Sequence, residues 1–240
     1  MSEFSYIPPP SPPGPPPPAE KTFDFVKPFT FLFQDAGWLN KVLLGGLFYL
    51  GIVVIVGIFF VLGYLARLAR NVVAGMEQPA PEWDDLGEYF GEGLMLAGVV
   101  LVYVIPFVVL AGAVFIPAGI LGALSNGHDL ANVFAGGVVS CAACLIMPAS
   151  LAMSFWLPQA LLLASVDRRF GAAFEFGRIW RSISGNIGNY LLAFVVYLVA
   201  RFAAGMGLML LCIGVFFTAF WAMVVATYAF AQAYRMSPSR

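Results

Sequence analysis

Long runs of hydrophobic residues without ionisable side chains divide the chain. A membrane-spanning helix needs roughly 20 apolar residues. Each run has about the length of one such helix or of two short ones. The runs are continuous rather than alternating, which favours helices over the strands of a membrane barrel. We therefore predict an all-α fold, a polytopic transmembrane helical bundle. The uncharged stretches are 42–66, 94–128, 130–166, 182–200 and 202–234.

Glycine breaks and the limits of these stretches predict about six spans. In this interpretation the first two spans form a hairpin of short helices; the alternative is one long helix from Leu39 to Arg70, which gives an odd number of spans. Six spans place eleven of the twelve Lys and Arg residues on one side, all but Arg201. Basic residues gather on the cytoplasmic side, so we expect both termini to be cytoplasmic. The expected spans are about 39–54, 56–71, 93–123, 130–165, 189–204 and 207–234.

An internal repeat is indicated by two similar segments. Phe23–Phe29 matches Phe174–Trp180 in its aromatic, acidic, aromatic, basic and aromatic positions. We therefore expect pseudo-repeats that start near residues 23 and 174. In both copies, Asp35 and Asn186 precede the following hydrophobic run and are N-cap candidates for it.

Both copies also predict a short amphipathic helix. Apolar residues recur at helical spacing and are interrupted by the charges of Lys27, Arg178 and Arg181. Such helices favour the headgroup region of a membrane, with rings inserted and cations toward phosphates.

Residues 1–20 are rich in proline and predict a disordered, solvated tail on the cytoplasmic side. The tail is either a spacer or a ligand for an aromatic groove on a partner. The transmembrane domain then comprises residues 21–240. The first hydrophobic run lacks the features of a signal peptide, so we expect no processing.

Composition agrees with a membrane protein. Hydrophobic residues make up 61% of the chain and charged residues 10%, against about 25% charged in a soluble domain. The net charge of −1 provides no field that would attract nucleic acid.

The segment Glu77–Glu92 carries six carboxylates and no basic residue. Oxygen ligands from Glu82, Asp85 and Glu92 suit a hard cation such as calcium, but the spacing lacks the calcium-loop pattern. We favour a solvated interfacial segment that aromatic residues anchor at the membrane surface. These anchors are Trp83, Tyr89 and Phe90, and the candidate functional residues of the segment are Glu82, Trp83, Asp84 and Asp85.

Arg201 is the remaining candidate functional residue. A cation inside a span is costly and usually faces protein, water or a ligand. Arg201 either contacts an anion or extends its side chain to the nearby interface, and we favour the second interpretation.

Catalytic machinery is not indicated. Cys141 and Cys144 form a CxxC without further metal ligands, so we expect the thiols to pack in the membrane core. The chain has no GxxxxGK[ST], HExxH or GxSxG motif. We expect no catalytic, cofactor-binding or metal-binding residues, and no enzyme activity.

A resemblance to a known family rests on several short motifs along the chain. Residues 23 to about 235 resemble a family of uncharacterised bacterial and archaeal multi-pass membrane proteins, catalogued as a domain of unknown function. The resemblance implies helical topology and a location in the inner (plasma) membrane, and brings no activity or site residues. The motifs are Trp38, Lys41, Gly45-Gly-Leu47, Gly63-Tyr64, Arg70, Pro81-Glu-Trp-Asp-Asp85 and Gly91.

Two hypotheses for function follow. The first is a non-enzymatic scaffold or accessory subunit of a membrane complex, based on abundant glycine and the amphipathic helices. The alternative is a transporter or lipid-handling protein for a small or anionic substrate, based on the repeat and proline-containing spans. The expected partners are membrane lipids, and other membrane subunits or further copies of the chain, with no nucleic acid.

Overall fold

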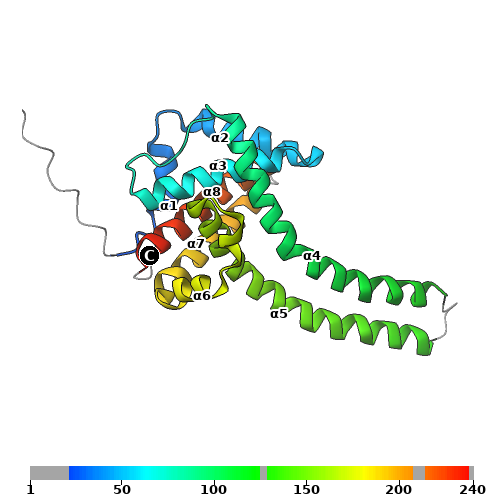
Figure 1. Cartoon of the computed structure of the whole chain (residues 1–240). Helices are drawn as coiled ribbons and strands as arrows, with labels where there is room; N and C mark the ends of the chain where they lie inside the picture. The colour runs from blue at the N-terminus through cyan, green and yellow to red at the C-terminus, as the bar shows by residue number, and fades with distance from the viewer. Residues whose placement is uncertain (1–21, 125–128, 208–213, 238–240) are drawn as a thin grey trace, which may run out of the picture.

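The computed structural model describes residues 22–124, 129–207 and 214–237, so the proline-rich tail lies outside the described residues. Every regular element in these ranges is a helix, which confirms the all-α class (Figure 1). The elements are α1 (Lys27–Thr30), η1 (Phe31–Gln34), α2 (Trp38–Leu50), η2 (Gly51–Val54), α3 (Gly57–Ala74), α4 (Leu86–Leu124), α5 (Asp129–Asp167), η3 (Phe170–Phe174), α6 (Phe176–Ser184), α7 (Ile187–Met206) and α8 (Gly214–Arg235), where η marks a 3-10 helix.

Five helices in the described ranges are long and apolar enough to cross a membrane. The first expected span, 39–54, is shorter than predicted, because α2 has only 13 residues. That is about 20 Å at 1.5 Å per residue, against a hydrocarbon core of about 30 Å. The five candidate spans are Gly57–Ala74, Leu86–Ala123, Gly136–Asp167, Ile187–Met206 and Gly214–Arg235.

The first hydrophobic run forms two helices, so the alternative of one long helix is wrong. After α2 the chain enters η2 and then turns at Ile55, whose φ of 69° is outside the helical region. The helices on either side of the turn contact each other directly. The rings of Phe48 in α2 and Phe60 in α3 stack with centroids 4.8 Å apart. Gly57 lies so close to the backbone of Phe48 and Gly51 that a side chain there would clash.

The core of the bundle surrounds α8. Almost every residue from Ala219 to Tyr234 is buried, and α8 packs against α2, α3 and α7. A helix that is apolar on all sides is stable only when neighbours cover it or when lipid surrounds it. The small alanine side chains of α8 let these neighbours approach closely.

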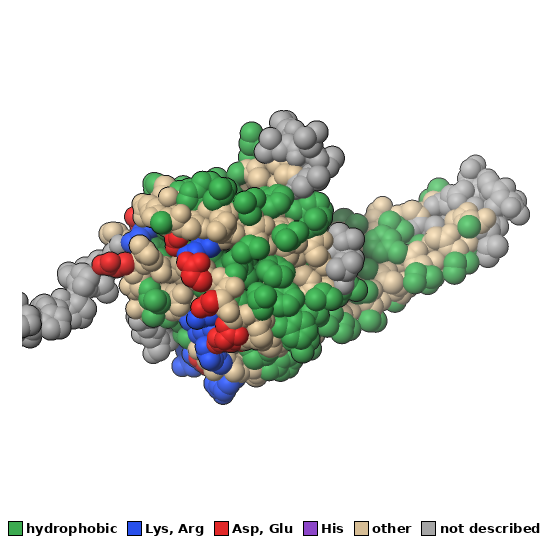
Figure 2. Space-filling model, turned by 90° about the horizontal axis from the view of Figure 1, so that it is seen from above, with side chains coloured by type: hydrophobic (Ala, Val, Ile, Leu, Met, Phe, Trp, Pro, Cys, Tyr) green, Lys and Arg blue, Asp and Glu red, His purple; other side chains and the backbone are tan. Residues whose placement is uncertain are grey.

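Most of the charged residues that the structure describes gather at one end of the bundle, which we call the charged end. Arg70 near the end of α3 donates to the carbonyl oxygen of Ser165 near the end of α5. Asn186, at the start of α7, donates to the carbonyl oxygen of Ala233 near the end of α8. Figure 2 shows the basic and acidic side chains together in one band on the face in view, while the rest of that face is largely apolar. Which side of the membrane this end faces stays a prediction.

α4 and α5 form a hairpin that leaves the bundle, as Figure 1 shows. Each has 39 residues and continues as one helix through two prolines. At 1.5 Å per residue each is about 58 Å long, nearly twice the thickness of the hydrocarbon core. Tyr103 of α4 still contacts the bundle, because its hydroxyl donates to the carbonyl oxygen of Ala173. We call residues 104–124 and 129–153 the distal hairpin.

The two cysteines of the CxxC lie on the distal hairpin rather than in a packed core. Both Cys141 and Cys144 are exposed and free. Among the described helices only α4 lies beside the distal part of α5 (Figure 1), so both thiols are on the outer surface of the hairpin, and their packing in the membrane core stays a prediction.

The two segments predicted to be amphipathic differ in form. The first is divided into α1 and η1, four residues each, whereas the second is the nine-residue α6. On α6, Ile179 and Ile183 are buried while Phe176 and Trp180 are 57% and 62% exposed. The headgroup location of these segments and the internal repeat stay predictions.

Candidate functional site

Lys41 is the buried anchor of the acidic segment. It lies on α2 and is only 2% exposed. Its Nζ lies 2.6 Å from Oδ2 of Asp35 and 2.7 Å from Oε1 of Glu82. It also donates to the carbonyl oxygen of Ala80 at 3.1 Å. These contacts tie the segment after α3 to the start of α2.

Asp35 pairs with Lys41 instead of capping α2. Burial disfavours its ionised form, but the hydrogen bonds from Lys41 and from the Gly37 N–H outweigh burial and hold the pKa of Asp35 below 3.8. Gly37 is the N-cap residue of α2, so the N-cap prediction for Asp35 is wrong. Asn186 does occupy the N-cap position of α7. Its side-chain amide donates to the carbonyl oxygen of Ala233 and accepts from the side chain of Asn189 in the first turn, but it makes no capping hydrogen bond to the helix backbone.

Trp83 is half-buried and packs against the core of the bundle. Its indole N–H donates to the carbonyl oxygen of Lys41 at 3.2 Å, and its ring stacks on Tyr64 with centroids 4.4 Å apart. Tyr89 is fully buried, whereas Phe90 is 38% exposed. Of the three aromatic anchors predicted for the membrane surface, Tyr89 is therefore enclosed by the bundle, Trp83 is partly covered and Phe90 is exposed.

The carboxylates of the acidic segment do not converge on one point. Glu82 pairs with Lys41, and Asp84 pairs with Arg67 at 3.3 Å. Asp85 accepts from the backbone N–H of Glu88 and so stabilises the start of α4. Glu88 and Glu92 pair with Arg70 and Arg168. In the described part of the chain no three potential ligands form a metal site, and the cation-site alternative has no geometric support.

A second ionic group joins α5, α6 and α8. The guanidinium of Arg178 donates to both carboxylate oxygens of Asp167 and, at 3.4 Å, to the hydroxyl of Tyr234. The hydrogen bond to Asp167 outweighs partial burial and raises the pKa of Arg178 above its usual value. These ion pairs connect the ends of α5, α6 and α8 at the charged end.

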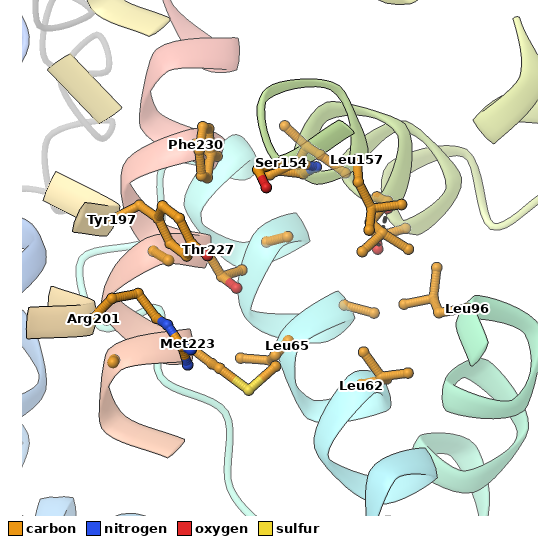
Figure 3. A pocket seen from close by; sticks show the side chains of 18 of the residues that line it. Leu62, Leu65, Leu96, Ser154, Leu157, Tyr197, Arg201, Met223, Thr227 and Phe230 are labelled. Atoms are coloured by element: carbon orange, nitrogen blue, oxygen red, sulfur yellow. Dashed lines mark hydrogen bonds between the residues drawn. The ribbon is translucent and has the colours of Figure 1, made fainter. Parts of the chain in front are cut away.

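A cavity of about 370 Å³ lies farther from the charged end, among α3, α5, α7 and α8 (Figure 3). Its walls are mainly leucine and alanine side chains. The lining residues are Tyr49, Leu62, Leu65, Ala66, Ala69, Leu96, Ser154, Leu157, Pro158, Leu161, Leu162, Ser165, Tyr197, Arg201, Ala222, Met223, Ala226, Thr227 and Phe230.

Arg201 is the one charged side chain among the described residues that line this cavity. Figure 3 shows its guanidinium between Tyr197 and Met223, at one end of the open space. It lies fourteen residues after the start of α7 at Ile187, about 21 Å from the charged end along the helix axis. None of the carboxylates that the structure describes pairs with it.

The two serine hydroxyls that line the cavity are already hydrogen-bonded within their own helix. The hydroxyl of Ser154 donates to the carbonyl oxygen of Ser150, and that of Ser165 to Leu161. Both bonds stay within α5. The cavity therefore offers a positive charge and apolar walls, an arrangement that suits an anion with an apolar tail.

The candidate residues of the sequence thus fall into two places. Glu82, Trp83, Asp84 and Asp85 belong to the charged end, where they hold helices together. Arg201 belongs to the cavity. The structure does not bring the two groups together.

Helices long and apolar enough to span a bilayer, with ionic residues gathered at one end and a cavity between helices, define a polytopic α-helical membrane protein. The family comparison agrees with this class. The chain belongs to the DUF4013 family of proteins of unknown function, whose model matches residues 46–213. No curated protein and no solved structure matches the chain.

Proposed function

We propose that this chain is a non-enzymatic membrane protein that handles a lipid-like substrate, and that the cavity binds an anionic amphiphile. The observation that carries the proposal is Arg201, which lines a mainly apolar cavity without a carboxylate partner among the described residues.

The energetics favour a ligand at this position. A cation within a membrane span is costly, and such residues mark substrate or ion pathways by default. An anionic headgroup would offset that cost through charge-assisted hydrogen bonds to the guanidinium, which are about twice as strong as neutral ones. An apolar tail would cover Leu62, Leu65 and Leu157, and burial of apolar area contributes roughly 25 cal/mol per Å².

Arg201→Gln will weaken retention of an anionic amphiphile. Loss of a charged hydrogen bond costs about 1.5–3 kcal/mol, which corresponds to roughly tenfold to a hundredfold weaker binding. Protein purified gently from its own membranes is extracted with organic solvent, and mass spectrometry quantifies the lipids per mole of protein. The wild type is expected to carry an anionic amphiphile that Arg201→Gln loses.

Arg181→Gln is the matched control. Arg181 is an exposed cation on α6, outside the cavity, and its Nε donates to the carbonyl oxygen of Gly177. The control removes the same charge and should retain the lipid. Equal lipid content in the wild type and both variants would contradict the proposal, as would equal loss from both variants.

The scaffold hypothesis is favoured by a different observation, the distal hairpin. Its outer surface is apolar, with Val109 64% and Leu145 73% exposed. Gly119 and Gly137 have open space around their Cα atoms. Small residues let membrane helices approach closely, so a hairpin of another copy of this chain is the partner that fits.

The native thiols test this second candidate. Cys141 and Cys144 lie exposed on the distal hairpin. If hairpins of two copies pair, a bis-maleimide of short reach will give a covalent dimer in native membranes. Cys212→Ser isolates these two thiols, and further Cys141→Ser and Cys144→Ser changes should abolish the product. A dimer that vanishes when the protein is diluted into excess lipid would indicate random collision and count against pairing.

A further inference from the structure

The cavity opens sideways, between α5 and α7. Ser154 on α5 and Arg201 on α7 both line the cavity and are exposed on the outside of the bundle. Figure 3 places Ser154 and Leu157 on one side of the open space and Tyr197 and Arg201 on the other. In a bilayer an opening on the flank of a bundle faces lipid, so a ligand reaches the cavity from the membrane.

Aromatic contacts close the same interface nearer the charged end. The hydroxyl of Tyr190 donates to the carbonyl oxygen of Phe155, and their rings meet edge to face with centroids 4.7 Å apart. Phe194 packs on Phe155 in the same way at 5.4 Å. The opening is therefore limited to the part of the α5–α7 interface around Arg201.

The cavity is closed at its inner end. Ser165 and Ala69 line it there and are 3% and 2% exposed. Immediately beyond them, Arg70 donates to the carbonyl oxygen of Ser165 and pairs with Glu92 at 2.8 Å. A ligand that enters from the flank thus places its charge at Arg201 and its apolar part toward the charged end, along Leu62, Leu65 and Leu161.

The volume limits the apolar part. About 370 Å³ is near the lower end of the roughly 300–1,000 Å³ found for small-molecule sites. Such a space accommodates one extended acyl chain, and the second chain of a diacyl lipid would remain outside. We propose that the occupant is a single-chain anionic amphiphile of the fatty-acid type, held by its carboxylate at Arg201. This inference rests on the proposed function and specifies its substrate class.

Photolabelling distinguishes the possible occupants. The full chain is reconstituted in nanodiscs of neutral phosphatidylcholine with one of two probes. One is a long-chain fatty acid with a diazirine near the chain end, and the other is phosphatidylglycerol with the same diazirine on one chain. Peptide mass spectrometry locates the adducts. We expect the fatty acid to label the cavity-lining parts of α3 and α5, and Arg201→Gln to reduce this labelling about tenfold.

A cavity-filling variant tests the location of the chain. Ala226 lines the cavity, and Ala226→Phe should abolish labelling of α3 and α5 by the fatty acid. Val199→Phe on the exposed face of α7 adds the same bulk outside the cavity and should leave labelling unchanged. Thermal unfolding of both variants identifies any loss of fold. If Ala226→Phe does not fold, competition in the wild type tests the location of the chain instead, because excess unlabelled fatty acid should displace the probe from the cavity.

The outcomes separate this inference from the proposed function. The diacyl probe could label the cavity as strongly as the fatty acid does, in a manner that depends on Arg201. That result would overturn the single-chain inference and leave the proposed function standing. Cavity labelling that inorganic phosphate displaces would assign Arg201 to a soluble anion and overturn the inference. Labelling that does not depend on Arg201 with either probe would overturn both.

Discussion

Lys41→Met will destabilise the protein by about 3 kcal/mol, because it removes one member of a buried ion pair and leaves the other. The side chains of Lys41 and Asp35 are 3% and 10% exposed. Loss of one partner of a buried pair typically costs about 3–5 kcal/mol, since the remaining charge is desolvated without compensation. The contact from Nζ to Ala80, which holds the acidic segment on α2, is lost as well. Detergent-solubilised protein should show a lower midpoint of thermal unfolding.

Two comparisons make this prediction specific. Arg169→Met removes a cation that also pairs with carboxylates, but the side chain of Arg169 is 63% exposed. Exposed pairs contribute about 0–1 kcal/mol, so that variant should unfold close to the wild type. Adding Asp35→Asn to Lys41→Met removes the orphaned charge and should recover part of the loss. Equal stability of Lys41→Met and Arg169→Met would show that the pair at α2 is not structurally important.

The sequence predicts the class of fold because the bilayer constrains it strongly. Uncharged stretches too long for a soluble core specify spanning helices, and the confirmed all-α bundle follows from them. The length of α2 was overestimated, because hydrophobicity continues through Gly51 to Val56 while the backbone turns at Ile55. A hydropathy pattern reports burial and says little about local backbone geometry.

The roles of individual charges were harder to predict. Arg201 was identified because an isolated cation in an apolar run is anomalous. Lys41 has a similar position at the edge of a run, but the sequence does not indicate its buried ion pairs, since its partners Asp35 and Glu82 come together only after folding. The acidic segment suggested a cluster, yet the partner of Glu88 is Arg168, eighty residues later.

The cavity has no signal in the sequence. Its lining comes from helices far apart in the chain, for example Leu62, Ser154 and Arg201. Apart from Arg201, each lining residue alone is an ordinary apolar, small or aromatic residue of a membrane helix. Only the packing of α3, α5, α7 and α8 creates the empty space beside the arginine.

Gly93→Ala will disrupt the crossing of α3 and α4. A Cβ atom at Gly93 would clash with the backbone carbonyl group of Phe59, and one at Gly63 would clash with the backbone of Tyr89. Overpacking usually costs about 1–3 kcal/mol. Here the obstacle is backbone rather than a flexible side chain, so the helices must separate, and we expect a cost at the upper end, about 3 kcal/mol. By the scaling for soluble proteins this corresponds to a fall in Tm on the order of 10 °C.

Gly91→Ala supplies the matched control, because it adds the same methyl group to the same helix two residues earlier. A Cβ atom at Gly91 meets no atom within 4 Å. Alanine also has about 1 kcal/mol better helix propensity than glycine, so Gly91→Ala should be neutral or stabilising. Because the propensity gain applies equally at residue 93, the difference in Tm between the two variants isolates the steric clash. If the two unfold at the same temperature, α3 and α4 do not cross in backbone contact at this point.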